Sequence, residues 1–137
     1  MSQHSKYVIR PHEVEAYSPA NHTGTRNRRL VGPRVNGSRH LEIVLGEIER
    51  NEGALAHAHP DVEQAVYVLE GEAEVEIDDV PHTVRAGDLM YFPARVFHSI
   101  KVTSPIIRML VIYGPPYDER PEQVILKTEE GRAVTSS

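Results

Sequence analysis

The sequence predicts a single all-β domain. Short segments rich in β-branched and aromatic residues recur from Leu41 to Tyr113, and clusters of Gly, Pro, Asn and Asp separate them. Helical periodicity is hard to find anywhere in the chain. Strands at such even spacing are typical of a sandwich or a closed barrel. A length of 137 residues with 39% hydrophobic content suits one domain that buries its own core.

The expected strands follow one another between short turns. Glu72 to Ile77 alternates strictly between acidic and apolar residues, which indicates one wet face and one buried face. Asp78 and Asp79 supply a turn after it, residues 86–88 supply another, and Pro93 stops a short strand. In order, the expected strands are 41–49, 64–70, 72–77, 80–85, 89–92, 97–103 and 106–113.

The chain divides into three parts by composition. Residues 41–117 carry the strand pattern and are expected to form the barrel. Residues 1–40, rich in Asn, Gly, Ser, Pro and Arg, are expected to form an N-terminal arm with short strands that packs on the barrel or on a dimer partner. Residues 118–137 form a polar C-terminal tail, which is expected to fray from Thr128 onward.

The charge and composition exclude several classes of partner. A net charge of -5 argues against a nucleic-acid-binding protein, which normally carries a basic surplus on one face. The start of the chain has no apolar signal region, and no later apolar run is long enough to cross a membrane. We therefore expect a soluble, cytoplasmic protein that acts on a small molecule. Because cysteine is absent, any metal ligands must be histidine, carboxylate or amide groups.

Two histidines separated by one residue, His57 and His59, are the most informative feature of the chain. Alternate residues of an extended strand point to the same face, so these imidazoles converge only if the segment is a strand. Gln64 follows closely and a lone His98 lies further along. Such a set can build a divalent metal site.

The residues around these histidines resemble a known family. His57 to Gly71 resembles the first cupin motif, and Gly87 to His98 resembles the second. The resemblance implies a cupin double-stranded β-helix, a jelly-roll barrel with a divalent metal in its mouth, and often a homodimer. It also implies one metal ion per chain, for which Mn, Fe, Ni, Co and Zn are all candidates.

Position by position, the motifs imply that the metal ligands are His57, His59, Gln64 and His98. Gln64 stands where the family usually has glutamate. Three imidazoles and an amide leave the metal charge uncompensated, which strengthens a Lewis acid and disfavours an oxidised metal. Glu63 is the alternative fourth ligand if the loop after His59 is one residue tighter. Asn51, Arg95 and Val102 also depart from the usual motif residues, at positions that concern turns more than ligands.

Several other side chains are candidates for substrate binding. An arginine placed over the barrel mouth would hold a substrate carboxylate, although the plainer interpretation of the arm arginines is a solvated surface or a dimer contact. The candidates are Arg26, Arg28, Tyr67, Lys101 and Arg108. The remaining histidines lack a spacing partner and are expected at the surface or in turns; these are His4, His12, His22, His40 and His82.

Together these observations favour a metal-dependent enzyme of the isomerase, lyase, decarboxylase or cyclase kind, acting on a small carboxylated or hydroxy-keto substrate. One alternative is a cupin dioxygenase that uses iron. Another is a non-catalytic module that binds a sugar or an organic acid. A fourth metal position closed by protein would favour the binding module, because catalytic metal sites keep a position free.

Overall fold

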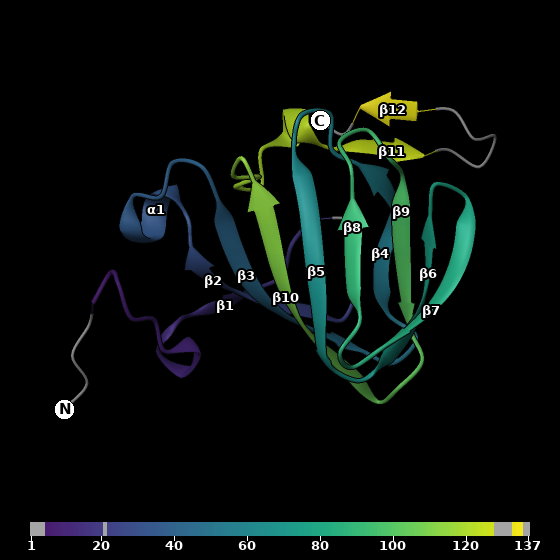
Figure 1. Cartoon of the computed structure of the whole chain (residues 1–137), viewed down its shortest axis with the longest axis horizontal. Coiled ribbons are helices and arrows are strands. Elements are labelled where there is room, and N and C mark those ends of the chain that lie inside the picture. Colours follow the sequence, from purple (N-terminus) through teal and green to yellow (C-terminus); the bar gives the residue numbers. More distant parts are fainter. Residues whose placement is uncertain (1–4, 21, 128–132, 136–137) are drawn as a thin grey trace.

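The computed structural model describes residues 5–20, 22–127 and 133–135, which form two antiparallel β-sheets (Figure 1). The first sheet contains β1 (Ala16–Tyr17), β2 (Thr25–Val31), β3 (Glu42–Glu49), β5 (Glu63–Glu70), β8 (Leu89–Phe92) and β10 (Ile106–Gly114). The second contains β4 (Gly53–Ala58), β6 (Glu72–Ile77), β7 (Val80–Arg85), β9 (His98–Val102), β11 (Ile125–Lys127) and β12 (Ala133–Thr135). Short helical segments are Pro11–Glu13, α1 (Pro33–Asn36) and Pro121–Gln123.

The strand order within each sheet is that of a jelly roll. The first sheet runs β1-β2-β3-β10-β5-β8 and the second runs β12-β11-β4-β9-β6-β7. The predictions of an all-β fold and of a jelly-roll barrel are thereby confirmed. Among the described residues, no helix is long and apolar enough to pass through a bilayer.

Most strands lie where the residue pattern predicts them. β6, β7 and β8 have the expected bounds, and β3, β5, β9 and β10 differ by one residue at one or both ends. Asp78 and Asp79 have φ values of 51° and 66°, which are the positive values that a two-residue hairpin turn requires. The alternation in β6 also has the expected meaning, because Ala73 and Val75 are buried while Glu74 and Glu76 are exposed.

The core fills the space between the sheets and comes from alternate residues of facing strands. On β10, Ile107, Met109 and Val111 point inward and are buried. They pack with valines of β5 and β6 in one continuous hydrophobic cluster. Burial of this kind contributes roughly 1.5–3 kcal/mol per large apolar side chain.

The sheets extend beyond the predicted barrel of residues 41–117. β2 pairs with β3 along its length, and β11 pairs with β4, so the predicted arm and tail both contribute strands. β2 was hard to see in the sequence because its buried positions, Thr25 and Asn27, are polar. In the tail, the predicted fraying falls largely on residues 128–132 and 136–137, which lie outside the described residues, while β12 pairs with β11.

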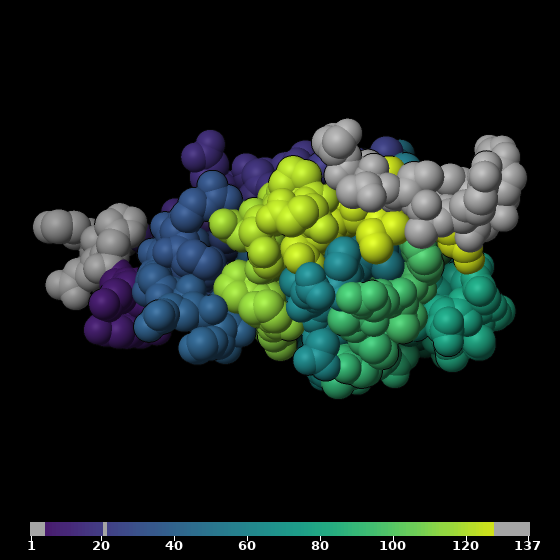
Figure 2. All heavy atoms as spheres, turned by 90° about the horizontal axis from the view of Figure 1, so that it is seen from above, coloured from purple at the N-terminus to yellow at the C-terminus, as the bar shows by residue number. Residues whose placement is uncertain are grey.

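The segment between β10 and β11 covers one end of the barrel. Viewed from above, its yellow-green residues lie between the blue N-terminal part and the green strands (Figure 2). Tyr117 and Val124 from this segment pack with Val62, which follows β4, in a second small hydrophobic cluster. The end of β4 that carries His57 is therefore enclosed by the C-terminal part of the chain.

Candidate metal centre

Three histidines converge inside the barrel. His57 lies near the end of β4, His59 follows that strand, and His98 begins β9. β4 and β9 are neighbours in the second sheet, with His57 directly opposite His98. One ring nitrogen from each histidine lies within 4.8 Å of those of the other two, and all three residues are buried.

Each imidazole is oriented by its Nδ1 atom, which lies within hydrogen-bond distance of a backbone carbonyl. A carbonyl only accepts, so in the neutral ring Nδ1 carries the proton and Nε2 carries the lone pair. A hydrogen bond of this kind is the usual support for a metal-binding histidine. The carbonyls belong to Leu55 at 2.7 Å from His57, to Gln123 at 2.8 Å from His59 and to Val96 at 3.2 Å from His98.

The electrostatics keep these imidazoles neutral. Burial lowers the pKa of His57 to about 3, with the neighbouring His59 as a second cause. Burial also lowers the pKa of His59 and brings that of His98 well below its ordinary value. Because a metal binds the deprotonated ring nitrogen, neutral imidazoles need to release no proton near pH 7.

Gln64 faces the imidazoles from the opposite sheet. It lies on the inward face of β5, is 8% exposed, and its Oε1 atom is buried without a hydrogen-bond partner. The Nε2 atoms of His59 and His98 are likewise buried without a partner. Among the described residues, Gln64, His59 and His98 therefore offer unpaired lone pairs to the barrel interior, and His57 belongs to the same cluster of imidazoles.

Glu63, the alternative fourth ligand, faces the other way. It is exposed on the outer face of β5 and accepts a hydrogen bond from the Tyr91 hydroxyl. Adjacent residues of a strand point to opposite faces, so only one of Glu63 and Gln64 can face the imidazoles. The structure places Gln64 there.

A fourth histidine, His22, also reaches this region. It precedes β2, and its ring centre lies 6.0 Å from that of His57. Its Nδ1 atom is buried without a partner, and burial lowers its pKa to about 4. The expectation that His22 lies at the surface is wrong, because a bridge to Ala54 of β4 holds it against the barrel.

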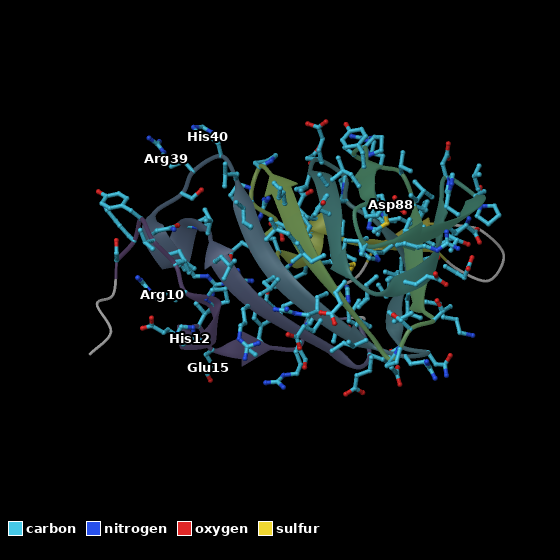
Figure 3. The ribbon with its side chains drawn as sticks, turned by 60° about the horizontal axis from the view of Figure 1, so that its bottom comes forward. Arg10, His12, Glu15, Arg39, His40 and Asp88 are labelled. Carbon is cyan, nitrogen blue, oxygen red and sulfur yellow. The ribbon has the colours of Figure 1, made fainter. Side chains whose placement is uncertain are left out.

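The other isolated histidines lie as expected where the structure describes them. Figure 3 shows His12 and His40 on the periphery, away from the space between the sheets. His82 is exposed on β7. His4 falls outside the described residues. No spacing signal in the sequence distinguishes the buried His22 from His12, His40 and His82.

His22, His57 and His98 line a pocket between the sheets, together with Gln64. Its floor is apolar and includes Val66, Met90 and Met109, while Asn27 and Tyr113 contribute polar atoms. Phe92 stacks on the His98 ring with a centroid separation of 4.0 Å and an interplanar angle of 7°, which holds that ring in place. Apolar walls with a few polar groups are typical of small-molecule sites.

The five predicted substrate-binding residues do not line this pocket in the described part of the chain. Strand register places them on outer surfaces, and register cannot be read with certainty from sequence. Arg26 and Lys101 are exposed, Tyr67 is 41% exposed, the Arg28 Nε donates to the Val14 carbonyl, and Arg108 lies beside Glu47 and Glu70.

The sequence and the fold of the chain are both similar to those of known proteins. A sequence model of the cupin domain matches residues 44–113. SchB of Streptomyces halstedii is 32% identical over 112 residues, which cover 82% of this chain and 81% of SchB. The polyketide synthase CurC of Streptomyces cyaneus is 26% identical over 117 residues, covering 85% of this chain and 76% of CurC. The structure of KdgF from Halomonas sp. superposes with a TM-score of 0.72 at 20% identity, covering 81% of this chain and 94% of KdgF.

Proposed function

The chain belongs to the cupin family, and on that premise we propose that it is a metal-dependent enzyme with a three-His, one-Gln centre. The observation that carries the proposal is the convergence of buried imidazole nitrogens on a pocket that also receives the unpartnered Gln64 Oε1. A divalent metal bound by these atoms would act as a Lewis acid on a carbonyl oxygen of the substrate.

The donor set supports this chemistry over oxygen activation. Three nitrogen donors and one neutral oxygen donor suit Mn, Fe, Co, Ni or Zn, and none of the four donors brings negative charge. The full charge of a bound metal then acts on the substrate, and an oxidised metal is less stabilised. An iron dioxygenase is therefore the second candidate.

The pocket lining favours a hydroxy-keto substrate over a carboxylated one. Among the described residues, no Lys or Arg lines the pocket, so no guanidinium or ammonium is in place to pair with a substrate carboxylate. The apolar floor suits a carbon skeleton, and Asn27 and Ser99 offer groups that hydrogen-bond to hydroxyl or carbonyl oxygens. Because the relative CurC is named a polyketide synthase, we place cyclisation or dehydration of a keto chain first among the possible reactions.

Hydrogen–deuterium exchange tests the proposed Lewis-acid chemistry. The protein is loaded with Zn, Mn, Fe, Co or Ni in turn, and exchange at the carbons next to the carbonyl of hydroxyacetone is followed in D2O by proton NMR. We expect the metal-loaded protein to raise the exchange rate by at least about 100-fold over chelator-treated protein, the scale of positioned acid–base catalysis. Oxygen uptake without exchange would instead identify a dioxygenase, and saturable binding without either would identify a binding module.

We also propose that the protein is a homodimer that pairs through the outer face of its first sheet. Cross-strand rows on this face are apolar, with Tyr67 opposite both Leu89 and Leu110. Leu89 is 65% exposed and Tyr91 is 52% exposed, and a contiguous exposed apolar patch is typical of a surface that binds a partner.

An apolar patch of this kind can pair with itself. A twofold axis through it would set Tyr67 and Leu89 of one copy against the same patch of the other, in a shared apolar centre. We therefore expect Tyr67→Glu to weaken dimerisation by at least about tenfold, because it places a charge in the buried centre. Sedimentation across a concentration series measures the change. Val80→Glu, on an exposed apolar residue of the other sheet, is the control, and a wild-type protein that stays monomeric at high concentration would contradict the proposal.

A further inference from the structure

A second, polar pocket adjoins the metal centre. It shares His22, Asn27, His57 and Tyr113 with the first pocket. Its other walls come from the N-terminal arm and from the segment that covers this end of the barrel; they are Pro19, Ala20, Tyr117, Glu119 and Val124. A substrate that reaches the metal ligands therefore has this polar wall directly beside it.

Glu119 is the single carboxylate in this environment. Among the described residues, no other Asp or Glu lines either pocket, and neither Lys nor Arg does. Tyr117 lies beside Glu119 in the wall of this pocket, and burial, with Glu119 as a second cause, raises the pKa of the Tyr117 hydroxyl. Among the described residues, the other polar side chains of this second pocket are imidazole, amide and phenol groups, so Glu119 is the carboxylate base that it offers to a substrate.

The backbone at Glu119 has a positive φ angle, a conformation that residues other than glycine disfavour. Asp118 and Glu119 have φ values of 48° and 52°, in the left-handed region that disfavours residues other than glycine. Glu42 anchors the segment, because its Oε1 accepts a hydrogen bond from the Asp118 amide at 2.7 Å. Arg29 in turn donates to the Glu42 Oε2 at 2.7 Å. Strained residues held by buried contacts gather at functional sites, where they fix the position of a side chain.

The environment of Glu119 also suits proton transfer. Burial raises the pKa of its carboxyl above the ordinary value, Arg29 opposes the rise, and Glu42 adds to it. A carboxyl whose pKa moves toward neutrality exchanges protons more effectively near pH 7.

We propose that Glu119 is the catalytic residue that accepts a proton from the carbon next to the substrate carbonyl and later returns a proton. In the forward step the C–H bond breaks, its electron pair forms the C=C bond of an enolate while the carbonyl π pair moves to oxygen, and the proton moves to the Glu119 carboxylate. A later step returns that proton either to carbon, which re-forms the C–H bond and the carbonyl, or to a hydroxyl on the neighbouring carbon as its C–O bond breaks, so that water leaves and an unsaturated ketone remains. No electrons leave the substrate, so no oxidant is needed. This inference rests on the proposed Lewis-acid function.

Variants of Glu119 test this role in the full-length, metal-loaded protein with hydroxyacetone as the probe. Glu119→Gln keeps the size of the side chain but cannot accept the proton, so we expect exchange in D2O to slow by at least about 100-fold with metal content unchanged. Glu119→Asp should retain part of the rate. Glu122→Gln, an exposed acid three residues along the chain, is the matched control and should exchange at the wild-type rate.

A separate measurement covers the case in which Glu119→Gln disturbs the fold. Added formate should restore exchange in Glu119→Ala and leave the wild-type rate unchanged, a rescue that a purely structural role would not give. Wild-type exchange in Glu119→Gln, or equal losses in Glu119→Gln and Glu122→Gln, would overturn the role of Glu119 alone. If the metal-loaded wild-type protein exchanges no faster than the metal-free protein, the proposed function is overturned as well.

Discussion

His98→Ala should abolish metal retention. The imidazole of His98 is buried, its Nδ1 is held by the Val96 carbonyl, and its Nε2 has no hydrogen-bond partner among the residues that the structure describes. Loss of an outer hydrogen-bond partner alone costs roughly 10–100-fold in metal affinity, and loss of a ligand removes both the partner and the bond to metal. We therefore expect the purified variant to carry no metal after dialysis, as measured by elemental analysis, while the wild-type protein retains about one ion per chain.

His82→Ala is the matched control because His82 is exposed on β7 and far from the three converging rings. It should retain metal as the wild-type protein does. The stack of Phe92 on His98 also contributes to packing, so unfolding of each chelator-treated variant is measured separately from its metal content. Equal metal loss in the two variants would show that His98 is not a ligand. If wild-type protein that was never exposed to chelator or acid contains no metal, the proposed centre is wrong.

Glu42→Ala should destabilise the fold by about 3–5 kcal/mol, the scale of breaking a buried ion pair on one side. The Glu42 side chain is 1% exposed, and its partner Arg29 is 15% exposed. Removal of the carboxylate leaves the guanidinium with one side-chain hydrogen bond among the described residues, to the Tyr17 hydroxyl at 3.1 Å. It also frees the Asp118 amide. Urea denaturation of the chelator-treated protein measures the change in the free energy of unfolding.

Glu47→Ala provides a closely matched control on the same strand. Glu47 also faces an arginine, Arg108, at 3.4 Å, but the two side chains are 25% and 42% exposed. A pair this accessible to water contributes about 0–1 kcal/mol. Similar losses in the two variants would show that burial does not set the strength of the Glu42–Arg29 pair.

The parts of the fold that the sequence predicts well are those in which local pattern and burial agree. In β6, acidic residues alternate with apolar ones, and the sheet indeed buries Ala73 and Val75. Asp78 and Asp79 tolerate positive φ, so the hairpin turn was also visible. His57 and His59 were recognisable for the same reason, because a period of two on a strand brings both rings to one face.

The remainder of the site depends on contacts between distant segments. His22 and Glu119 meet beside the same pocket, although nothing in their local sequence relates them to the histidine pair. Short strands were expected in the N-terminal arm, but the position of β2 could not be predicted because its inward residues are polar and face the site. The outward placement of Arg26, Lys101 and Arg108 follows from strand register, which composition and charge do not determine.

The carbonyl of Gln123 makes the C-terminal segment part of the metal centre. It orients the His59 ring, and the Gln123 side chain also holds the backbone amide of Asp61 at 2.9 Å. The sequence predicted that the barrel ends at residue 117. A protein shortened to residues 1–117 would keep His57, His59, Gln64 and His98, but it would lose the carbonyl that orients His59. In this chain the segment that follows β10 therefore joins two tasks, since one carbonyl orients a buried imidazole while neighbouring residues form the wall of the adjoining pocket.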